Sequence, residues 1–396
     1  MKKILGITTI RSDYDLLSGL YRLLDADPEI DLRLLVAGAH LSHNYGHSID
    51  LIRQDGFSIL ATIESLIDGD SASSRLKTAS ILLQNAIDIV AAWSPDLITY
   101  AGDREDVLIG AMIGVYLKIP TAHFFGGDHE KDGHSDTVVR HATSKLSTVH
   151  VVSIDEHRRR LIAMGESPAR IFVAGNIALD KFLEHRPITP RELLSRLPKD
   201  KELDGYALLI YHPVDDEKGD AGVYFQNILE TLLEMKIPVC VSFPNTDPGN
   251  HAIIEVIQRY ENHHRLWFYR NLERDLFLSL YKNACFLIGN SSSGIMEAAS
   301  IPLGVVNVGL RQRGRLAGNN VVFCDSDRAS IRQAVEKVLS PSMREQLCSI
   351  INPYGDGYSC NRAYEFLKNA DFRLICVKSE DPLDLGNHSL INKGAL

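Results

Sequence analysis

Residues 284–297 read ACFLIGNSSSGIME, and this stretch decides the fold class of the chain. An apolar run gives way at residue 289 to two glycines and three serines, a pattern typical of a buried parallel strand that passes into a helix. The free N–H groups and dipole of a helix start favour an anion, and glycine lets the backbone approach it. We therefore predict an α/β fold with a phosphate site here, although a serine-rich helix cap without a ligand gives the same pattern.

The same alternation of short apolar runs with longer helical segments continues in both directions, which predicts parallel sheets built from crossover units. A polar, proline-bearing stretch at 187–204 separates two such halves. We predict a Rossmann-like domain at 1–186, a second one at 187–358, and a C-terminal helix and tail at 359–396. The expected strands are 4–8, 32–36, 97–101, 121–125, 150–153 and 171–174 in the first half, and 207–211, 239–243, 266–269, 286–288, 305–308 and 321–324 in the second.

The segment 71–93 has the period of an amphipathic helix. Its apolar side is predicted to consist of Leu76, Ala79, Leu83, Ala86, Ile87 and Val90.

Composition narrows the class of protein. The chain has 396 residues, 45% of them hydrophobic, which is enough for two domains with buried cores. Its formal charge of -9 argues against a nucleic-acid partner, and no window is apolar enough to span a bilayer. The first ten residues are typical of a first strand, not of a signal peptide. The six scattered cysteines predict reduced thiols, so we expect a cytoplasmic protein with no membrane partner.

Polar residues follow the expected strands in both halves, where open parallel sheets bind their ligands. These segments are 9–14, 102–104, 126–128, 211–213, 243–245, 289–294 and 309–315. Seven polar strand ends in two domains predict a ligand site in a cleft between two facing sheets.

This ordered set resembles the hydrolysing UDP-N-acetylglucosamine 2-epimerases. The motifs are Arg11-x-Asp13-Tyr14, Gly102-Asp103-Arg104, Gly126-Gly127 with Arg140-His141, His212-Pro213-Val214, Pro244-Asn245, GNSSSG, and Arg311-Gln312-x-Gly314-Arg315. The resemblance implies the glycosyltransferase-B arrangement of two Rossmann-like domains and conversion of a UDP-linked 2-acetamido sugar to the free manno-configured sugar plus UDP. It also implies a place in sialic or legionaminic acid synthesis, no cofactor, and a homodimer or homotetramer.

Roles for individual residues follow from the resemblance. The diphosphate would be held by Arg11, His212, Ser291, Ser292 and Arg311, within a substrate-binding set that also includes Asp15, Ser293 and Gly294. Glu297, about one helical turn past the serines, would accept from the ribose, and Asn245 would contact the nucleotide end. His40 would face the sugar, and Arg104 would lie on the substrate side. Asp103, Asp136 and His212 would serve catalysis, although the two aspartates also suit helix caps.

One position departs from the family pattern. Phe125 stands where relatives carry a catalytic glutamate in an HxEGGE segment, and a phenylalanine cannot move a proton. Asp128 is the first candidate to replace it. The loop after Asp128 is about two residues longer than in those relatives, and it adds the candidates His129, Glu130, Asp132 and His134. The same cluster invites a metal hypothesis, but its spacing matches no tight ligand pair, so we expect no metal.

We therefore predict a hydrolysing 2-epimerase that eliminates UDP to a 2-acetamidoglucal and then adds water. Three alternatives stay open on the sequence: a non-hydrolysing UDP-sugar 2-epimerase, a UDP-sugar glycosyltransferase, and an inactive UDP-sugar-binding protein that has lost catalysis with the change at Phe125.

Overall fold

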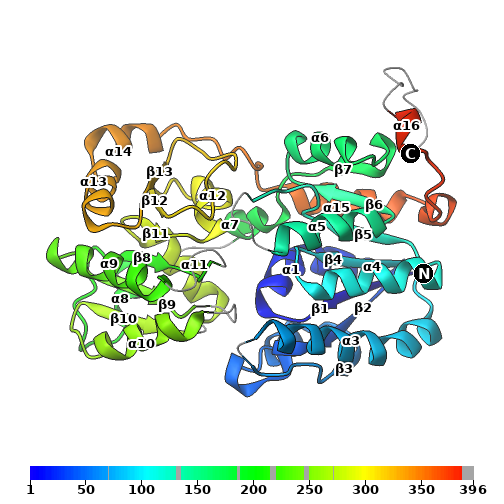
Figure 1. The fold of residues 1–396 in the computed structure, drawn as a ribbon, viewed down its shortest axis with the longest axis horizontal. Coiled ribbons are helices and arrows are strands. Elements are labelled where there is room, and N and C mark those ends of the chain that lie inside the picture. The colour runs from blue at the N-terminus through cyan, green and yellow to red at the C-terminus, as the bar shows by residue number, and fades with distance from the viewer. Residues whose placement is uncertain are drawn as a thin grey trace. The chain divides into compact units, whose positions relative to one another are not determined.

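A computed structural model describes residues 1–69, 71–130, 135–184, 188–214, 220–244, 249–270 and 272–385. The chain forms two compact units (Figure 1). Unit 1 comprises 1–128, 135–180 and 355–396, and unit 2 comprises 129–134 and 181–354. The chain therefore changes unit at 128/129, 134/135, 180/181 and 354/355. The domain boundaries expected from the sequence stay predictions.

Unit 1 contains a seven-stranded parallel sheet with the order β3-β2-β1-β4-β5-β6-β7. The strands are β1 (Lys2–Thr8), β2 (Ile30–Ala37), β3 (Ile59–Ile63), β4 (Leu97–Ala101), β5 (Thr121–Phe124), β6 (Val149–Val152) and β7 (Ile171–Val173). The helices are α1 (Arg11–Asp25), α2 (Ile49–Gln54), α3 (Ala72–Trp93), α4 (Glu105–Leu117), α5 (Ser135–Leu146), α6 (Asp155–Ala163), α15 (Ser359–Asn369) and α16 (Pro382–Leu385).

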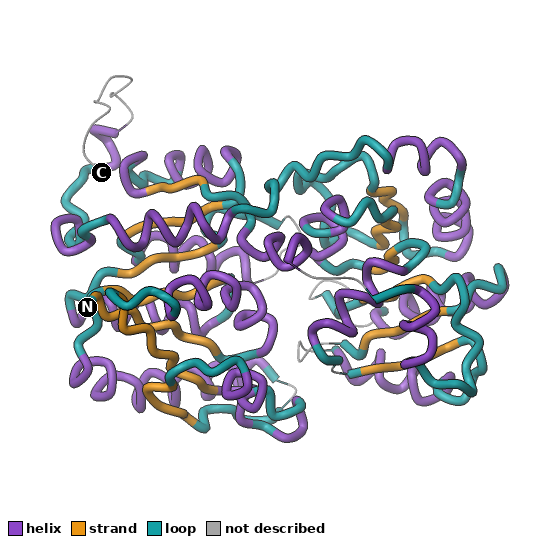
Figure 2. The backbone as a smooth tube through the Cα atoms, turned by 180° about the vertical axis from the view of Figure 1, so that it is seen from behind, coloured by secondary structure: helices purple, strands orange, loops and turns teal. Residues whose placement is uncertain are grey.

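Side chains of the central strands alternate between two cores, as the period of a strand requires. On β1, Ile4 packs into a cluster with residues of α1 and α15, whereas Leu5 packs into a cluster with residues of α3 and α4. Figure 2 shows helices on both faces of the strands. The sheet is thus buried on both sides, which explains its near-continuous apolar strands.

Unit 2 contains a six-stranded parallel sheet with the order β10-β9-β8-β11-β12-β13. Its strands are β8 (Ala207–Ile210), β9 (Val239–Ser242), β10 (Leu266–Tyr269), β11 (Leu287–Gly289), β12 (Val305–Val308) and β13 (Val321–Cys324). Its helices are α8 (Pro190–Arg196), α9 (Ala221–Glu234), α10 (Asn250–Tyr260), α11 (Arg274–Asn283), α12 (Ser292–Met296), α13 (Arg328–Val338) and α14 (Pro341–Leu347), and α7 (Asp180–Glu184) carries the passage from unit 1.

The predicted α/β class with two wound parallel sheets is confirmed, and every predicted strand is present to within two residues at each end. The sequence prediction missed β3, an edge strand whose side chains are mostly half-buried and whose pairing with β2 shifts register.

The predicted apolar side of α3 is wrong at two positions. Leu76 is 71% exposed and Ile87 is 38% exposed, while the buried stripe includes Ala79, Leu82, Ala86 and Val90. The stripe is buried only from Ala79 onward, and Ile87 lies one residue, about 100° of helix, away from Ala86.

Among the described residues, no helix has the length and apolar content that a membrane crossing requires.

Candidate functional site

In each unit the strand order reverses at one point, and several of the predicted site residues follow the strands that flank it. The reversal lies between β1 and β4 in unit 1 and between β8 and β11 in unit 2. Crossover helices leave in opposite directions from such a point, so it opens a crevice at the carboxyl ends of the strands. The residues near the two reversals differ in chemistry. Those of unit 2 are polar and cationic, and those of unit 1 include several carboxylates.

In unit 2, the side chain of Asn290 ties the two strands of the reversal together. Its Oδ1 accepts from the backbone N–H of His212 at 2.8 Å, and its Nδ2 donates to the His212 carbonyl at 2.8 Å. Asn290 is 1% exposed. Both hydrogen bonds therefore form in a dry interior, where they define the position of His212 at the end of β8.

Gly289 makes this close approach feasible. Its φ is +130°, and a Cβ there would lie 2.0 Å from the carbonyl oxygen of Ile210. Glycine alone has no Cβ and tolerates this conformation at low cost. The first glycine of GNSSSG is thus required by the packing of β11 against β8.

The serines of GNSSSG begin a helix, as predicted. The Oγ of Ser291 accepts from the backbone N–H of Ser293 at 3.3 Å and lies 2.9 Å from the Ser293 hydroxyl. Ser292 is the first residue of α12, and Gly294 packs closely against Val305. The serine hydroxyls are half-buried, beside the helix start.

Two side chains from the segment after β12 converge on the backbone of Asn290. Arg311 Nη1 donates to the Asn290 carbonyl at 3.0 Å, and Gln312 Nε2 donates to the same oxygen at 3.1 Å. Arg311 is partly exposed and Gln312 is fully buried. The GNSSSG turn and Arg311 therefore lie in direct contact.

Glu297 follows α12 and already has a cationic partner. Lys181 Nζ lies 3.0 Å from Glu297 Oε1, and Glu297 is 9% exposed. The lysine orients the carboxylate that we expect to meet the ribose. Asn245 lies outside the described residues.

A buried ion pair supports this side of unit 2. Arg315 Nη1 lies 2.6 Å from Glu130 Oε1 and 2.7 Å from Gln312 Oε1. Glu130 is 7% and Arg315 is 8% exposed. Glu130 is one of the loop candidates, and the structure pairs it with the last arginine of the RQxGR motif.

In unit 1, Arg11 and Asp15 form an ion pair in the first turns of α1, with 3.4 Å between Arg11 Nε and Asp15 Oδ2.

Next to this ion pair lies a pair of buried carboxyls that the sequence prediction did not single out. Asp13 is 8% and Asp106 is 5% exposed, and the Thr9 hydroxyl donates to Asp13 Oδ2 at 3.4 Å. Burial raises the pKa of Asp106 to about 6, and burial together with Asp106 raises the pKa of Asp13 well above its usual range.

Asp103 forms an ion pair with Arg140 of α5, and Arg104 occupies the N-cap position of α4. The guanidinium of Arg140 is 4% exposed, whereas the side chain of Asp103 is 26% exposed. The carboxylate is thus anchored from inside and accessible from outside, which suits a catalytic group and goes beyond a helix cap.

Asp136, in the first turn of α5, lies 3.4 Å from Arg75 Nη2. The same guanidinium lies 2.7 Å from Glu105. Arg75 is 61 residues away in sequence, so no local signal could have predicted this contact.

The side chain of Phe125 lies in the hydrophobic core of unit 1 and offers no reactive group. Its φ is +65°, a conformation that a bulky residue adopts rarely. Asp128, three residues on, is 4% exposed and lies 3.4 Å from His157 Nε2 of α6. The candidate replacement for the family glutamate therefore has an imidazole as its partner.

His40, which the family resemblance places at the sugar, lies in the interior of unit 1. Its ring is fully buried, with Nε2 2.9 Å from the Thr8 hydroxyl and Nδ1 2.8 Å from the Ser48 hydroxyl. Burial lowers the pKa of His40 to about 4, so the ring is neutral at pH 7. Both ring nitrogens are already engaged, and a contact with the sugar stays a prediction without geometric support.

No cluster of three or more potential metal ligands occurs in the part of the chain that the structure describes. Asp132 and His134 lie outside the described residues.

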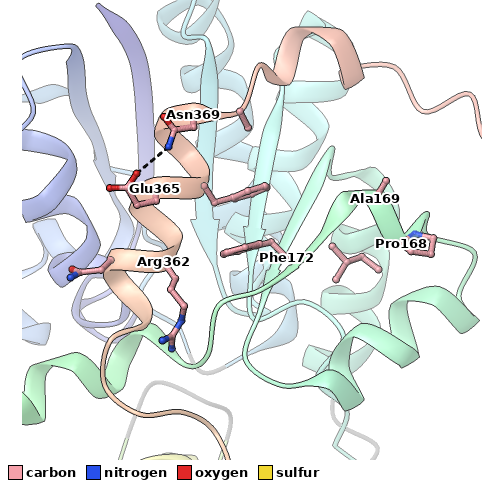
Figure 3. A pocket seen from close by; sticks show the side chains of 10 residues that line it. Pro168, Ala169, Phe172, Arg362, Glu365 and Asn369 are labelled. Carbon is pink, nitrogen blue, oxygen red and sulfur yellow. Dashed lines mark hydrogen bonds between the residues drawn. The ribbon is translucent and has the colours of Figure 1, made fainter. Parts of the chain in front are cut away.

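A pocket of about 630 Å³ lies elsewhere in unit 1, between β7 and α15 (Figure 3). Phe172 and Phe366 stack in its wall with ring centroids 4.6 Å apart, and Arg362, Glu365 and Asn369 project from α15. Its lining contains none of the predicted site residues, so the candidate site is not this pocket.

Comparison with known proteins shows the family of the chain. The family model described as UDP-N-acetylglucosamine 2-epimerase matches residues 22–368. The UDP-N,N'-diacetylbacillosamine 2-epimerase (hydrolyzing) of Legionella pneumophila is 35% identical over 372 residues, which cover 93% of this chain and 96% of that protein. The GDP/UDP-N,N'-diacetylbacillosamine 2-epimerase (hydrolyzing) of Campylobacter jejuni is 30% identical over 349 residues, or 87% of this chain and 89% of that protein.

Among solved structures, the UDP-GlcNAc 2-epimerase from Neisseria meningitidis bound to UDP-GlcNAc superimposes with a TM-score of 0.79 and 16% identity, covering 93% of this chain and 100% of that one. At this identity the likeness is one of fold. Because the family model matches residues 22–368 and the Legionella relative is 35% identical over 93% of this chain, the chain belongs to the UDP-N-acetylglucosamine 2-epimerase family.

Proposed function

We propose that the protein is a hydrolysing 2-epimerase, which converts a UDP-linked 2-acetamido sugar to the free manno-configured sugar and UDP. The observation that carries the proposal is the match of 35% identity over 93% of the chain to a relative named as a hydrolysing enzyme. The C. jejuni relative carries the same term in its name. Both names specify diacetylbacillosamine, so we propose a 2,4-diacetamido-6-deoxy sugar as the first substrate to test and UDP-N-acetylglucosamine as the second.

The proposed reaction has two steps, an elimination and a hydration. The C1–O bond breaks and UDP leaves with its electron pair, while a base takes the C2 proton, which gives a 2-acetamidoglucal. Water then adds its oxygen to C1, and a proton returns to C2 from the opposite face. Because the C2 proton becomes acidic only as the C1–O bond breaks, the site needs carboxylates on the sugar side and fixed donors on the diphosphate side.

Unit 2 supplies the donors in this proposal. We assign to the diphosphate His212, the hydroxyls of Ser291 to Ser293 and Arg311. The family resemblance adds Arg11 to this set. The backbone of His212 and the guanidinium of Arg311 are both fixed on Asn290, so they need little reorganisation when negative charge grows on the leaving group. Glu297, oriented by Lys181, would accept from the ribose.

Unit 1 supplies the acids and bases. We propose that Asp103, held by Arg140, and Asp136, beside Arg75, move the protons at the sugar. Asp128, which lies 3.4 Å from His157 Nε2, is the proposed substitute for the glutamate absent at Phe125, because a carboxylate can take up and return a proton at the sugar. A free 2-acetamido manno sugar is a precursor for nonulosonic acids, so we propose a cytoplasmic role in sialic or legionaminic acid synthesis, as a homo-oligomer.

Purified protein incubated with each UDP-sugar tests the function. We expect release of UDP and appearance of a free manno-configured sugar by proton NMR, with deuterium at C2 when the reaction is run in deuterated water. Nucleotide sugar that stays unchanged in both tubes would overturn the proposal. A product that remains linked to UDP would instead indicate a non-hydrolysing epimerase.

Variants test the roles. Asp136→Asn and Asp128→Asn should each lower kcat by about 10²- to 10⁴-fold while the affinity for UDP changes less than about threefold. Asp155→Asn, on the exposed start of α6, is the matched control and should behave as wild type. Full activity of Asp128→Asn would assign the role vacated at Phe125 to another group.

A further inference from the structure

The chain that follows Asp128 packs into unit 2 through Glu130. Asp128 and Ser135 belong to unit 1, but His129 and Glu130 between them belong to unit 2. Glu130 follows Asp128 by two residues and precedes Asp136 by six, so the anchored residue lies between two proposed proton-transfer groups.

The anchor of Glu130 is a buried ion pair with additional support. Its carboxylate lies 2.6 Å from Arg315 Nη1, and the same nitrogen lies 2.7 Å from Gln312 Oε1. Arg315 Nη2 also lies 3.9 Å from the sulfur of Met296, the last residue of α12. A buried pair adds little net stability because desolvation offsets the attraction, but it sets position strongly, since either charge left alone in the interior is costly.

From Arg315 the contacts continue without a break to the nucleotide side. Gln312 Nε2 donates to the Asn290 carbonyl at 3.1 Å, and the Asn290 side chain makes two hydrogen bonds of 2.8 Å to the backbone of His212. Glu130, Arg315, Gln312 and Asn290 are each less than 9% exposed. Networks of this kind polarise cooperatively and have few alternative arrangements.

We propose that Glu130 is a positioning residue, which links the loop of the sugar-side carboxylates to the network that holds the diphosphate donors. Binding of UDP at His212 and Arg311 stiffens this network, and Glu130 passes the constraint along the chain to Asp128, which precedes it by two residues. The inference rests on the proposed function for its catalytic consequence, but the linkage itself is a property of the protein with UDP alone.

Three variants separate positioning from a structural role. Glu130→Gln keeps the shape of the side chain and removes its charge, Arg315→Met removes the partner, and the double variant removes both. The matched control is Glu192→Gln, whose carboxylate makes an exposed ion pair with Arg196 on α8. Each protein is assayed for kcat, KM and thermal midpoint, and for UDP affinity by calorimetry.

We expect Glu130→Gln to lower kcat at least tenfold at temperatures well below its thermal midpoint, with UDP affinity within about threefold of wild type. The double variant should be no more than about twofold slower than Arg315→Met, because one interaction is lost in each case. Glu192→Gln should match wild type. A kcat for Glu130→Gln within twofold of wild type, or effects that multiply in the double variant, would overturn the proposal.

Hydrogen exchange followed by mass spectrometry tests the linkage without turnover. UDP should slow exchange in peptides that contain Glu130 at least fivefold in wild type and not in Glu130→Gln. Without ligand, Glu130→Gln should exchange faster than wild type in peptides that contain Asn290. The linkage would be overturned if wild type and Glu130→Gln exchanged equally, both in the response of the Glu130 peptides to UDP and in the ligand-free Asn290 peptides. A wild-type protein that shows the linkage but releases no UDP from either sugar would sink the proposed function alone.

Discussion

Asn290→Asp is the most informative single change in unit 2, because it replaces one atom of the side chain that joins β8 to β11. The wild-type Nδ2 donates to the His212 carbonyl over 2.8 Å. In the variant a carboxylate oxygen would face that carbonyl oxygen at the same distance, while the other oxygen would still accept from the His212 N–H. The variant therefore loses one hydrogen bond and places a charge in an interior where Asn290 is 1% exposed.

The lost hydrogen bond and the buried charge both lower the free energy of unfolding. A net hydrogen bond contributes about 1 kcal/mol, and a rise of about 2 in the pKa of the buried carboxyl costs about 3 kcal/mol when it is ionised. We expect a loss of about 3–4 kcal/mol at pH 8, which lowers the thermal midpoint by roughly 6–16 °C for a unit of this size. The added negative charge beside the proposed diphosphate site should weaken UDP binding at least tenfold.

The pH dependence identifies the cause. Because the folded-state pKa of the introduced carboxyl is raised above its unfolded value, the protonated form is favoured by folding, and stability returns as pH falls through the folded pKa. The protonated carboxyl can donate to the His212 carbonyl, as the amide does. The difference in thermal midpoint between variant and wild type should thus shrink from pH 8 to pH 5.

Thermal melts of wild type, Asn290→Asp and a control at pH 5, 6, 7 and 8 provide the measurement. The control is Asn85→Asp, whose exposed amide donates to the carbonyl of Ile81 at 2.8 Å, so it undergoes the same chemical change outside the interior. A difference between Asn290→Asp and wild type that is absent, or that does not change with pH, would refute the role assigned to the Asn290 amide.

Three further predictions follow from the same geometry. Glu297→Gln removes the carboxylate that Lys181 orients, so the UDP dissociation constant measured by calorimetry should rise about tenfold. Lys181→Met should raise the same constant. Unchanged UDP binding in both variants would exclude a ribose contact at this position. Gly289→Ala places a Cβ 2.0 Å from a carbonyl oxygen of β8. The free energy of unfolding measured by chemical denaturation should fall by more than about 3 kcal/mol. An unchanged free energy of unfolding would show that β11 and β8 can separate at no cost. Burial raises the pKa of Asp106 from 3.8 to about 6, so ionisation of this carboxyl destabilises the folded state. The thermal midpoint of Asp106→Asn should therefore rise relative to that of wild type between about pH 4 and about pH 6, and the difference should persist above pH 7. A difference that is the same at every pH would contradict a buried ionisable carboxyl at this position.

Much of the fold was predictable because its signals are local. Strands such as β4 and β12 are short apolar runs buried on both faces, and their bounds in the structure match the prediction. The edge strand β3 was missed because an edge strand is only half-buried and lacks a continuous apolar run. The exposed Leu76 on α3 shows the same limit, since periodicity predicts which side of a helix is apolar but not where its packing begins.

The candidate site was predictable as a set of strand ends but not as a set of contacts. Arg75 reaches Asp136 across 61 residues, and Arg315 reaches Glu130 across 185, so no spacing along the chain could indicate either pair. The role of Asn290 was also invisible, because a polar residue inside a glycine- and serine-rich turn is expected from turn chemistry alone.

The sequence by itself determined the strand–helix alternation, the polar strand ends and the family motifs, because each depends on the order of residue types within a few turns of chain. The tertiary structure alone decided where those side chains point. It places Phe125 in the core and buries His40 between two hydroxyls, and it pairs Asp103 with Arg140. These outcomes depend on which groups are desolvated together, and desolvation is a property of packing between distant segments, not of any one segment.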